Sequence, residues 1–190
     1  INHQPGTGYA FIRSGNEDNH HCPEFPIFTS IILKTKKMEP GSYTQYYSHL
    51  VFSPKLHCPI QSIKLQERLF RYIPGIVKKL GHVPLAVNGM YDHVHVFYGM
   101  KPTVCPPETV KEIKRVSTLF LKEEGGLYNF KWQEGYGGFS YGRSQIDSVI
   151  KYVINQREHH QTKTFREEYI EFLEKFEIDY DPKYLFAFHE

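Results

Sequence analysis

The stretch VPLAVNGMYDHVHVFY, residues 83–98, carries the clearest structural signal in the chain. Residues 83–87 read as a short strand, Asn88-Gly89 is a strong hairpin signal, and a second strand covers residues 92–98. Side chains alternate along a strand, so His93 and His95 share one face while the valines between and after them point into a core. The stretch therefore predicts a β-hairpin that presents two histidines together.

The segments around this hairpin complete a longer pattern. Residues 43–53 read as a strand, and residues 61–80 as a helix that Pro74-Gly75 must kink or split. A second helix covers 106–123, and an aromatic, glycine-rich strand covers 130–141. Helices over 144–159 and 165–176 follow, and the tail from residue 179 is expected to be irregular. The order predicts an α+β fold: a ferredoxin-like βαββαβ antiparallel sheet with C-terminal helices, one of which carries Tyr152.

Residues 1–37 differ from the rest of the chain. They are rich in Gly, Asn, His and Pro, show no sustained period, and are followed by Met38. We expect a functional domain over 38–190, preceded by an upstream extension or a poorly ordered arm. A genuine N-terminal segment that packs on the core is the alternative.

Composition places the chain among ordinary folded proteins. It has 190 residues, of which 40% are hydrophobic and 23% charged. Three cysteines without a Cys-x-x-Cys pair argue against a disulfide scaffold and a structural zinc site, which favours a reduced, cytoplasmic protein. The most apolar early window, residues 25–33, is too short to span a bilayer.

The charges are unevenly distributed. Residues 55–79 hold six bases and one acid, whereas residues 165–190 hold eight acids and three bases. A basic first half would suit a polyanionic partner. A solvated helix face beside an acidic tail explains the same asymmetry equally well.

Tyr152 and Gln156 supply the remaining chemistry. One helical turn apart, they are expected to lie together at the edge of the apolar stripe of their helix. A metal ion held by His93, His95 and Gln156 would bind a phosphate oxygen, and the Tyr152 phenol would attack phosphorus to leave a phosphotyrosine. Two imidazoles and an amide favour Mg²⁺ or Mn²⁺. Taken alone, the His-x-His pair is equally consistent with two incidental histidines.

Weaker candidates surround these four residues. Asp92 could orient a neighbouring histidine. The possible DNA contacts are basic or aromatic side chains, for which solvent exposure or core packing is the simpler explanation. They are Lys55, Lys111, Lys114, Arg115, Tyr136 and His159.

His93-Val94-His95 with Tyr152 and Gln156 resembles the HUH single-tyrosine transposases of the smallest bacterial insertion sequences, the IS200 type. Residues 43–55, 88–95, 132–140 and 152–160 resemble further segments of that family. The resemblance implies cleavage and rejoining of single-stranded DNA at element ends through a 5′-phosphotyrosine on Tyr152. It also implies a divalent metal on His93, His95 and Gln156.

The same resemblance implies hairpin-ended single-stranded DNA as the partner and a homodimer. In many members the tyrosine helix serves the metal site of the partner subunit, so assembly within one chain or between two stays open here. Two alternative functions also stay open: a domesticated nuclease of the same fold that cuts repeat hairpins, and a non-catalytic module that binds single-stranded nucleic acid. The sequence does not reveal the hairpin or the cleavage site.

Overall fold

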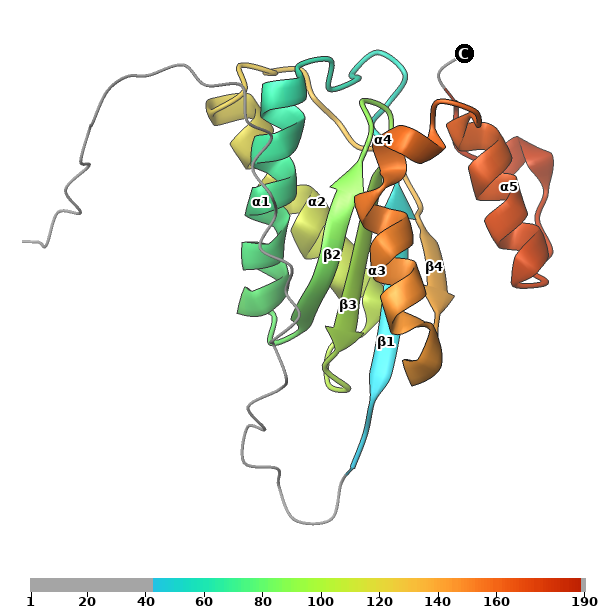
Figure 1. The fold of residues 1–190 in the computed structure, drawn as a ribbon. Coiled ribbons are helices and arrows are strands. Elements are labelled where there is room, and N and C mark those ends of the chain that lie inside the picture. The colour runs from blue at the N-terminus through green and yellow to red at the C-terminus, as the bar shows by residue number, and fades with distance from the viewer. Residues whose placement is uncertain (1–42, 189–190) are drawn as a thin grey trace, which may run out of the picture. The chain divides into compact units, whose positions relative to one another are not determined.

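The protein, represented by a computed structural model, is described over residues 43–188 (Figure 1), so the expected extension at 1–37 lies outside the described residues. Its centre is a four-stranded antiparallel sheet with strand order β2-β3-β1-β4. The strands are β1 (Tyr46–Phe52), β2 (Val83–Gly89), β3 (Val94–Met100) and β4 (Gly137–Ser140). Helix α1 (Ile63–Lys79) joins β1 to β2, and α2 (Pro106–Glu123) joins β3 to β4. The predicted ferredoxin-like βαββαβ fold is confirmed.

The C-terminal part adds helices to this core. A short 3₁₀ turn (Arg143–Gln145) leads into α3 (Ile146–Ile154), which is followed by α4 (Gln156–His159), α5 (Phe165–Lys175) and a second 3₁₀ turn (Pro182–Tyr184). The prediction of one helix over 144–159 was wrong, because Asn155 has a ψ of 22° and separates α3 from α4. Asparagine is a poor helix former because its side chain competes for local backbone hydrogen bonds.

The hairpin forms, but its turn is not where the sequence indicated. Asn88 and Gly89 belong to β2 and pair with His95 and Val94, and the connection is closed further on, where the N–H of Met90 donates to the carbonyl of His93 at 3.0 Å. A Cβ atom on Gly89 would lie 2.2 Å from that carbonyl oxygen. The glycine is therefore needed for a close backbone approach rather than as a turn residue.

Two other elements differ from their predicted extents. Helix α1 continues through Pro74 without a split. Its N-cap is Ser62, whose side chain accepts a hydrogen bond from the N–H of Leu65 at 3.4 Å. The strand expected over 130–141 is limited to β4, with Trp132 forming only an isolated bridge to Pro54. Gly135, at φ 75°, turns the chain between these two pairings.

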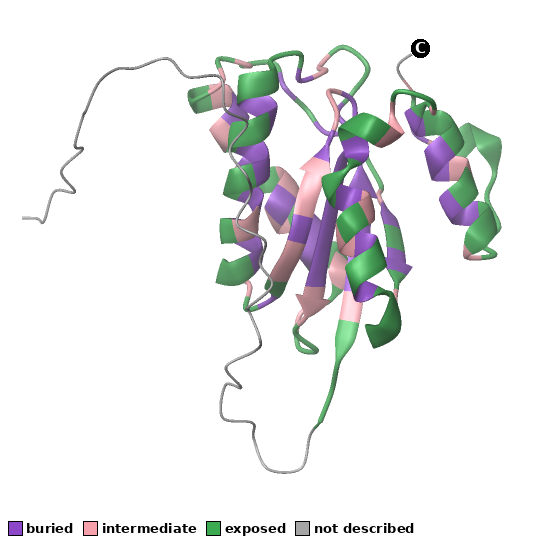
Figure 2. Cartoon of the chain, in the orientation of Figure 1, coloured by how far each residue is buried: buried purple, intermediate pink, exposed green. Residues whose placement is uncertain are grey.

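The two central strands, β1 and β3, are largely buried on both faces (Figure 2). Leu50, Phe52, Val94, Val96 and Tyr98 pack with residues of α1 and α2. On the other face, alternate strand residues pack with α3 and α5; they are Val51, Phe97 and Phe139. The histidine-bearing strand is thus enclosed on both sides.

Within residues 43–188, none of the helices has both the length and the apolar character needed to cross a lipid bilayer.

Candidate active site

Four residues singled out from the sequence lie together, and a fifth, Glu168 of α5, lies between them. Nε2 of His93 is 3.1 Å from Oε1 of Gln156. The amide nitrogen of Gln156 donates to Oε1 of Glu168 at 2.8 Å, and the hydroxyl of Tyr152 donates to the same oxygen. One carboxylate oxygen therefore holds both the phenol of α3 and the amide of α4.

The other oxygen of Glu168 faces the histidines. Oε2 lies 3.3 Å from Nε2 of His95, 3.6 Å from Nε2 of His93 and 3.2 Å from Nε2 of His160. The side chain is 1% exposed. Burial acts to raise the pKa of Glu168, but the imidazoles of His95 and His160 outweigh it and hold this pKa below its ordinary value. Glu168 is thus a buried carboxylate that links the histidine pair to Tyr152.

His95 is oriented by another buried histidine. Nδ1 of His95 is 2.9 Å from Nε2 of His49 on β1, and both rings are fully buried. Burial lowers the pKa of both His49 and His95. When Nδ1 of His95 donates to His49, the lone pair on Nε2 of His95 is directed towards Glu168. In that tautomer Nε2 of His95 is able to bind a metal ion.

His93 is oriented in the same way by an acid. Nδ1 of His93 lies 2.8 Å from Oδ1 of Asp92, which leaves Nε2 facing Gln156 and Glu168. The hydroxyl of Ser53 donates to the backbone carbonyl of Asp92 at 2.6 Å, anchoring this turn to the end of β1. The contact is the one expected of an orienting carboxylate.

The donor set fits a divalent metal ion. His93, His95 and Glu168 each offer one ligand atom within 4.8 Å of the others, and Oε1 of Gln156 adjoins them. Nε2 of His95 is buried and has no hydrogen-bond partner among the described residues. Neighbouring donors are 3.1–3.6 Å apart, close to the roughly 3.0 Å between adjacent ligands of an octahedral ion with bonds of about 2.1 Å. Imidazole, amide and carboxylate ligands together suit Mg²⁺ or Mn²⁺.

Tyr152 lies in a setting that keeps its proton. Burial, followed by the nearby carboxylate of Glu168, raises the pKa of Tyr152 well above its ordinary value. Its hydroxyl is also 3.4 Å from Nε2 of His159, and its ring meets that of His95 edge-on with centroids 6.1 Å apart. The tyrosine thus meets histidines of its own chain.

The other candidate DNA contacts lie apart from this cluster or have partners of their own. Helix α2, which bears Lys111, Lys114 and Arg115, packs on the opposite face of the sheet. Lys114 donates to the carbonyls of Gln133 at 2.8 Å and Gly135 at 2.5 Å. Lys111 and Arg115 form ion pairs with acids of their own helix. Lys55 is exposed, whereas Tyr136 packs against the core on the α2 side of the sheet. Their contact with DNA stays a prediction.

Glu168 was missed because it was counted as part of an acidic tail. A signal was nonetheless present: Phe165, Tyr169 and Phe172 form an apolar helical stripe, and Glu168 occupies a position within it. A carboxylate on a buried stripe needs a partner. His49 lies within the predicted strand over residues 43–53 and was assigned no role there. Its polar ring among residues of a buried strand is the equivalent signal.

Comparisons with known proteins find a family model and solved structures to which the chain is similar. The family described as "Transposase IS200 like" matches residues 42–156. A solved structure from Deinococcus radiodurans R1, provisionally assigned as a transposase, is 20% identical, with a TM-score of 0.49 and 64% of this chain and 98% of that chain covered. A REP-associated tyrosine transposase bound to a REP hairpin is 16% identical, with a TM-score of 0.47 and coverages of 68% and 78%. The comparison with curated proteins finds no match.

Proposed function

This chain belongs to the IS200-like transposase family, and we propose that it cleaves and rejoins single-stranded DNA at the hairpin ends of a mobile element. Tyr152 is the proposed nucleophile. The observation that carries the proposal is the contact of one buried carboxylate, Glu168, with both the Tyr152 hydroxyl and the two metal-competent histidines. A residue that only packed the core would not need this set of polar neighbours.

Each residue has a separate part in the proposed reaction. The phenol oxygen of Tyr152 forms a bond to phosphorus as the bond from phosphorus to the 3′-oxygen breaks. The products are a 5′-phosphotyrosine and a 3′-oxyanion, which takes a proton from solvent to become a free 3′-hydroxyl. Oε1 of Glu168 holds the phenolic hydrogen and is placed to accept it. The energy of the broken bond is retained in the phosphotyrosine, so a second 3′-hydroxyl can rejoin the strand without ATP.

IS200-like transposases use a divalent metal ion, which we assign here to His93, His95, Gln156 and Glu168. When bound, the ion supplies positive charge that polarises the phosphate and offsets the charge developing on it. His49 and Asp92 hold the two imidazoles so that Nε2 of each would be available to a bound ion. Glu168 was not among the ligands inferred from the sequence.

The first test is a covalent adduct. The chain is incubated with single-stranded DNA from a flanking element end and Mg²⁺ or Mn²⁺, and adducts are resolved on a denaturing gel. Tyr152→Phe should abolish the adduct because it removes only the attacking oxygen. Tyr184→Phe, at a tyrosine that is 81% exposed, is the matched control and should leave it intact. An adduct that survives Tyr152→Phe would refute the assignment.

The second test concerns assembly. Because Tyr152 meets the histidines of its own chain, we propose an active site completed within one chain, also when two chains associate as a homodimer. Mixing Tyr152→Phe chains with His93→Ala chains should then yield no adduct, since neither chain holds both parts. Adduct formation by the mixture, with neither variant active alone, would establish assembly between chains instead. The molar mass from light scattering reports the dimer independently.

A further inference from the structure

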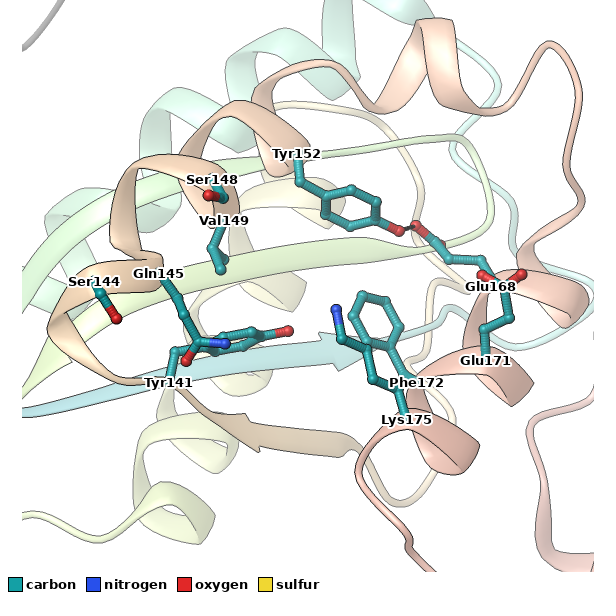
Figure 3. A pocket seen from close by; sticks show the side chains of 10 residues that line it. All are labelled: Tyr141, Ser144, Gln145, Ser148, Val149, Tyr152, Glu168, Glu171, Phe172 and Lys175. Atoms are coloured by element: carbon teal, nitrogen blue, oxygen red, sulfur yellow. Dashed lines mark hydrogen bonds between the residues drawn. The ribbon is translucent and has the colours of Figure 1, made fainter.

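A cavity of about 430 Å³ adjoins the proposed catalytic residues (Figure 3). It lies between α3 and α5, and Tyr152 and Glu168 form part of its lining. Tyr141, which follows β4, and Phe172 of α5 contribute aromatic rings. A ligand in this cavity would therefore be next to the phenol oxygen that is proposed to attack phosphate.

Several hydrogen-bonding groups of the lining are unused. Within residues 43–188, the hydroxyls of Tyr141 and Ser148 have no hydrogen-bond partner. Oε1 of Gln145 accepts from the N–H of Gly142 at 2.9 Å, which leaves its amide nitrogen free. Burial raises the pKa of Tyr141 to about 12, so its hydroxyl remains a donor at neutral pH. These groups match the donor and acceptor edges of a nucleobase.

The charge left free in the cavity is positive. The carboxylate of Glu171 forms an ion pair with Lys163. The carboxylate of Glu168 accepts hydrogen bonds from Tyr152 and Gln156 and contacts the histidines. The ammonium of Lys175 forms no ion pair in the described part of the chain. Figure 3 shows the Lys175 side chain extending from α5 towards Tyr141. This lysine is available for an anionic group such as a phosphate.

We propose that this cavity binds one unpaired nucleotide of the single-stranded DNA, next to the scissile phosphate. The proposal rests on the proposed function, because the strand must pass Tyr152 to be cut. The volume lies within the roughly 300–1,000 Å³ of small-molecule sites, which admits one nucleotide and excludes a base pair joined to its duplex. Tyr141 offers ring surface to the base, Ser148 and Gln145 contact its edge, and Lys175 contacts a phosphate.

The phosphate contact predicts a change in salt dependence. Binding of a fluorescent oligothymidylate is measured by anisotropy at several salt concentrations, without metal and in the Tyr152→Phe background, so that no cleavage intervenes. Lys175→Gln should reduce the slope of log affinity against log salt by about 0.7, the value for one phosphate contact to a single strand. Lys183→Gln, at an exposed lysine already paired with Asp181, should leave it unchanged. Equal slopes for both variants would overturn the contact.

The base contact predicts a position-specific effect. One abasic site is moved stepwise along the hairpin oligonucleotide used in the adduct assay. Affinity should fall about tenfold, within the range measured for loss of a stacked base, at a single position adjoining the scissile phosphate. Ser148→Ala and Tyr141→Phe should reduce discrimination among the four bases at that position. Equal affinity at every position of the abasic site would refute the cavity proposal without affecting the adduct result. Failure of the unmodified chain to form an adduct would refute the Tyr152 chemistry without affecting the binding result.

Discussion

Glu168 places one carboxylate oxygen on the Tyr152 hydroxyl and turns the other towards His93 and His95, so two functions meet in one side chain. A buried carboxylate is costly unless charges or donors surround it. Here the phenol of Tyr152 and the amide of Gln156 donate to the carboxylate, and three imidazoles lie within 3.6 Å of it. When a metal ion binds, the Glu168 carboxylate would contact the cation in place of the imidazoles. Glu168 is therefore included in the proposed ligand set.

The substitution Glu168→Gln tests this residue directly. It keeps the shape of the side chain and removes its charge, so Mn²⁺ affinity should fall at least about tenfold, comparable to losses around other metal sites. Isothermal titration without DNA measures the affinity, and thermal unfolding checks the fold. Glu171→Gln, on the same helix with a carboxylate paired to Lys163, is the control. Equal Mn²⁺ affinity in the two variants would remove Glu168 from the ligand set.

At the scale of elements, the β2–β3 hairpin brings His93 into the site. His93 precedes β3 and closes the turn with its carbonyl, so its backbone position depends on how tightly β2 approaches it. Gly89 permits that approach, because only a residue without Cβ fits against the His93 carbonyl. Local geometry at one glycine therefore influences a ligand position.

Gly89→Ala should consequently destabilise the protein and weaken metal binding together. The added Cβ would meet backbone atoms 2.2 Å away, and forced shifts of this kind cost about 1–3 kcal/mol. Urea unfolding measures the change in free energy. Gly75→Ala, where nothing lies within 4 Å of the added atom, is the matched control and should be neutral or slightly stabilising in helix α1. Equal stabilities would contradict the role assigned to Gly89.

At the scale of the whole molecule, the sheet separates two environments. One face packs on α1 and α2 as an apolar core, and the other holds the histidine cluster under α3 and α5. Lys114 lies at the edge of the apolar core that packs on α1 and α2. Its ammonium donates hydrogen bonds to the carbonyls of Gln133 and Gly135 and so links their loop to α2. Burial lowers the pKa of Lys114 to about 8 from its ordinary value of 10.5.

This shift predicts how stability depends on pH. Between about pH 8 and 10.5 the unfolded chain keeps the Lys114 proton that the folded chain releases, so the free energy of unfolding should rise with pH. After allowance for solvent screening the gain is on the order of 1 kcal/mol. Lys114→Met should lack this contribution. Urea unfolding measures the free energy of unfolding of the unmodified chain and of Lys114→Met across this pH range. Subtracting one from the other removes the contribution of tyrosine titration, which the two chains share. The same pH dependence in both chains would contradict the prediction.

Much of the architecture was predictable because its signals are local. Helix α2 was predicted with its observed bounds, and the order of the elements was correct. Two boundaries were predicted wrongly: Asn155 divides a helix whose apolar stripe looked continuous, and Gly89 lies in a strand instead of a turn. At Asn155 the low helix preference of asparagine outweighed the stripe, whereas at Gly89 the close approach of the His93 carbonyl set the boundary.

The sequence by itself determined which side chains could do the chemistry, since strand alternation put His93 and His95 on one face and helical spacing grouped Tyr152 with Gln156. Only the tertiary structure decided what completes the site. Glu168 reaches it from a separate helix, and His49 reaches it across the sheet from β1. Such partners are invisible to local periodicity, because they are selected by the packing of α5 and of neighbouring strands, which buries apolar surface far apart in the chain.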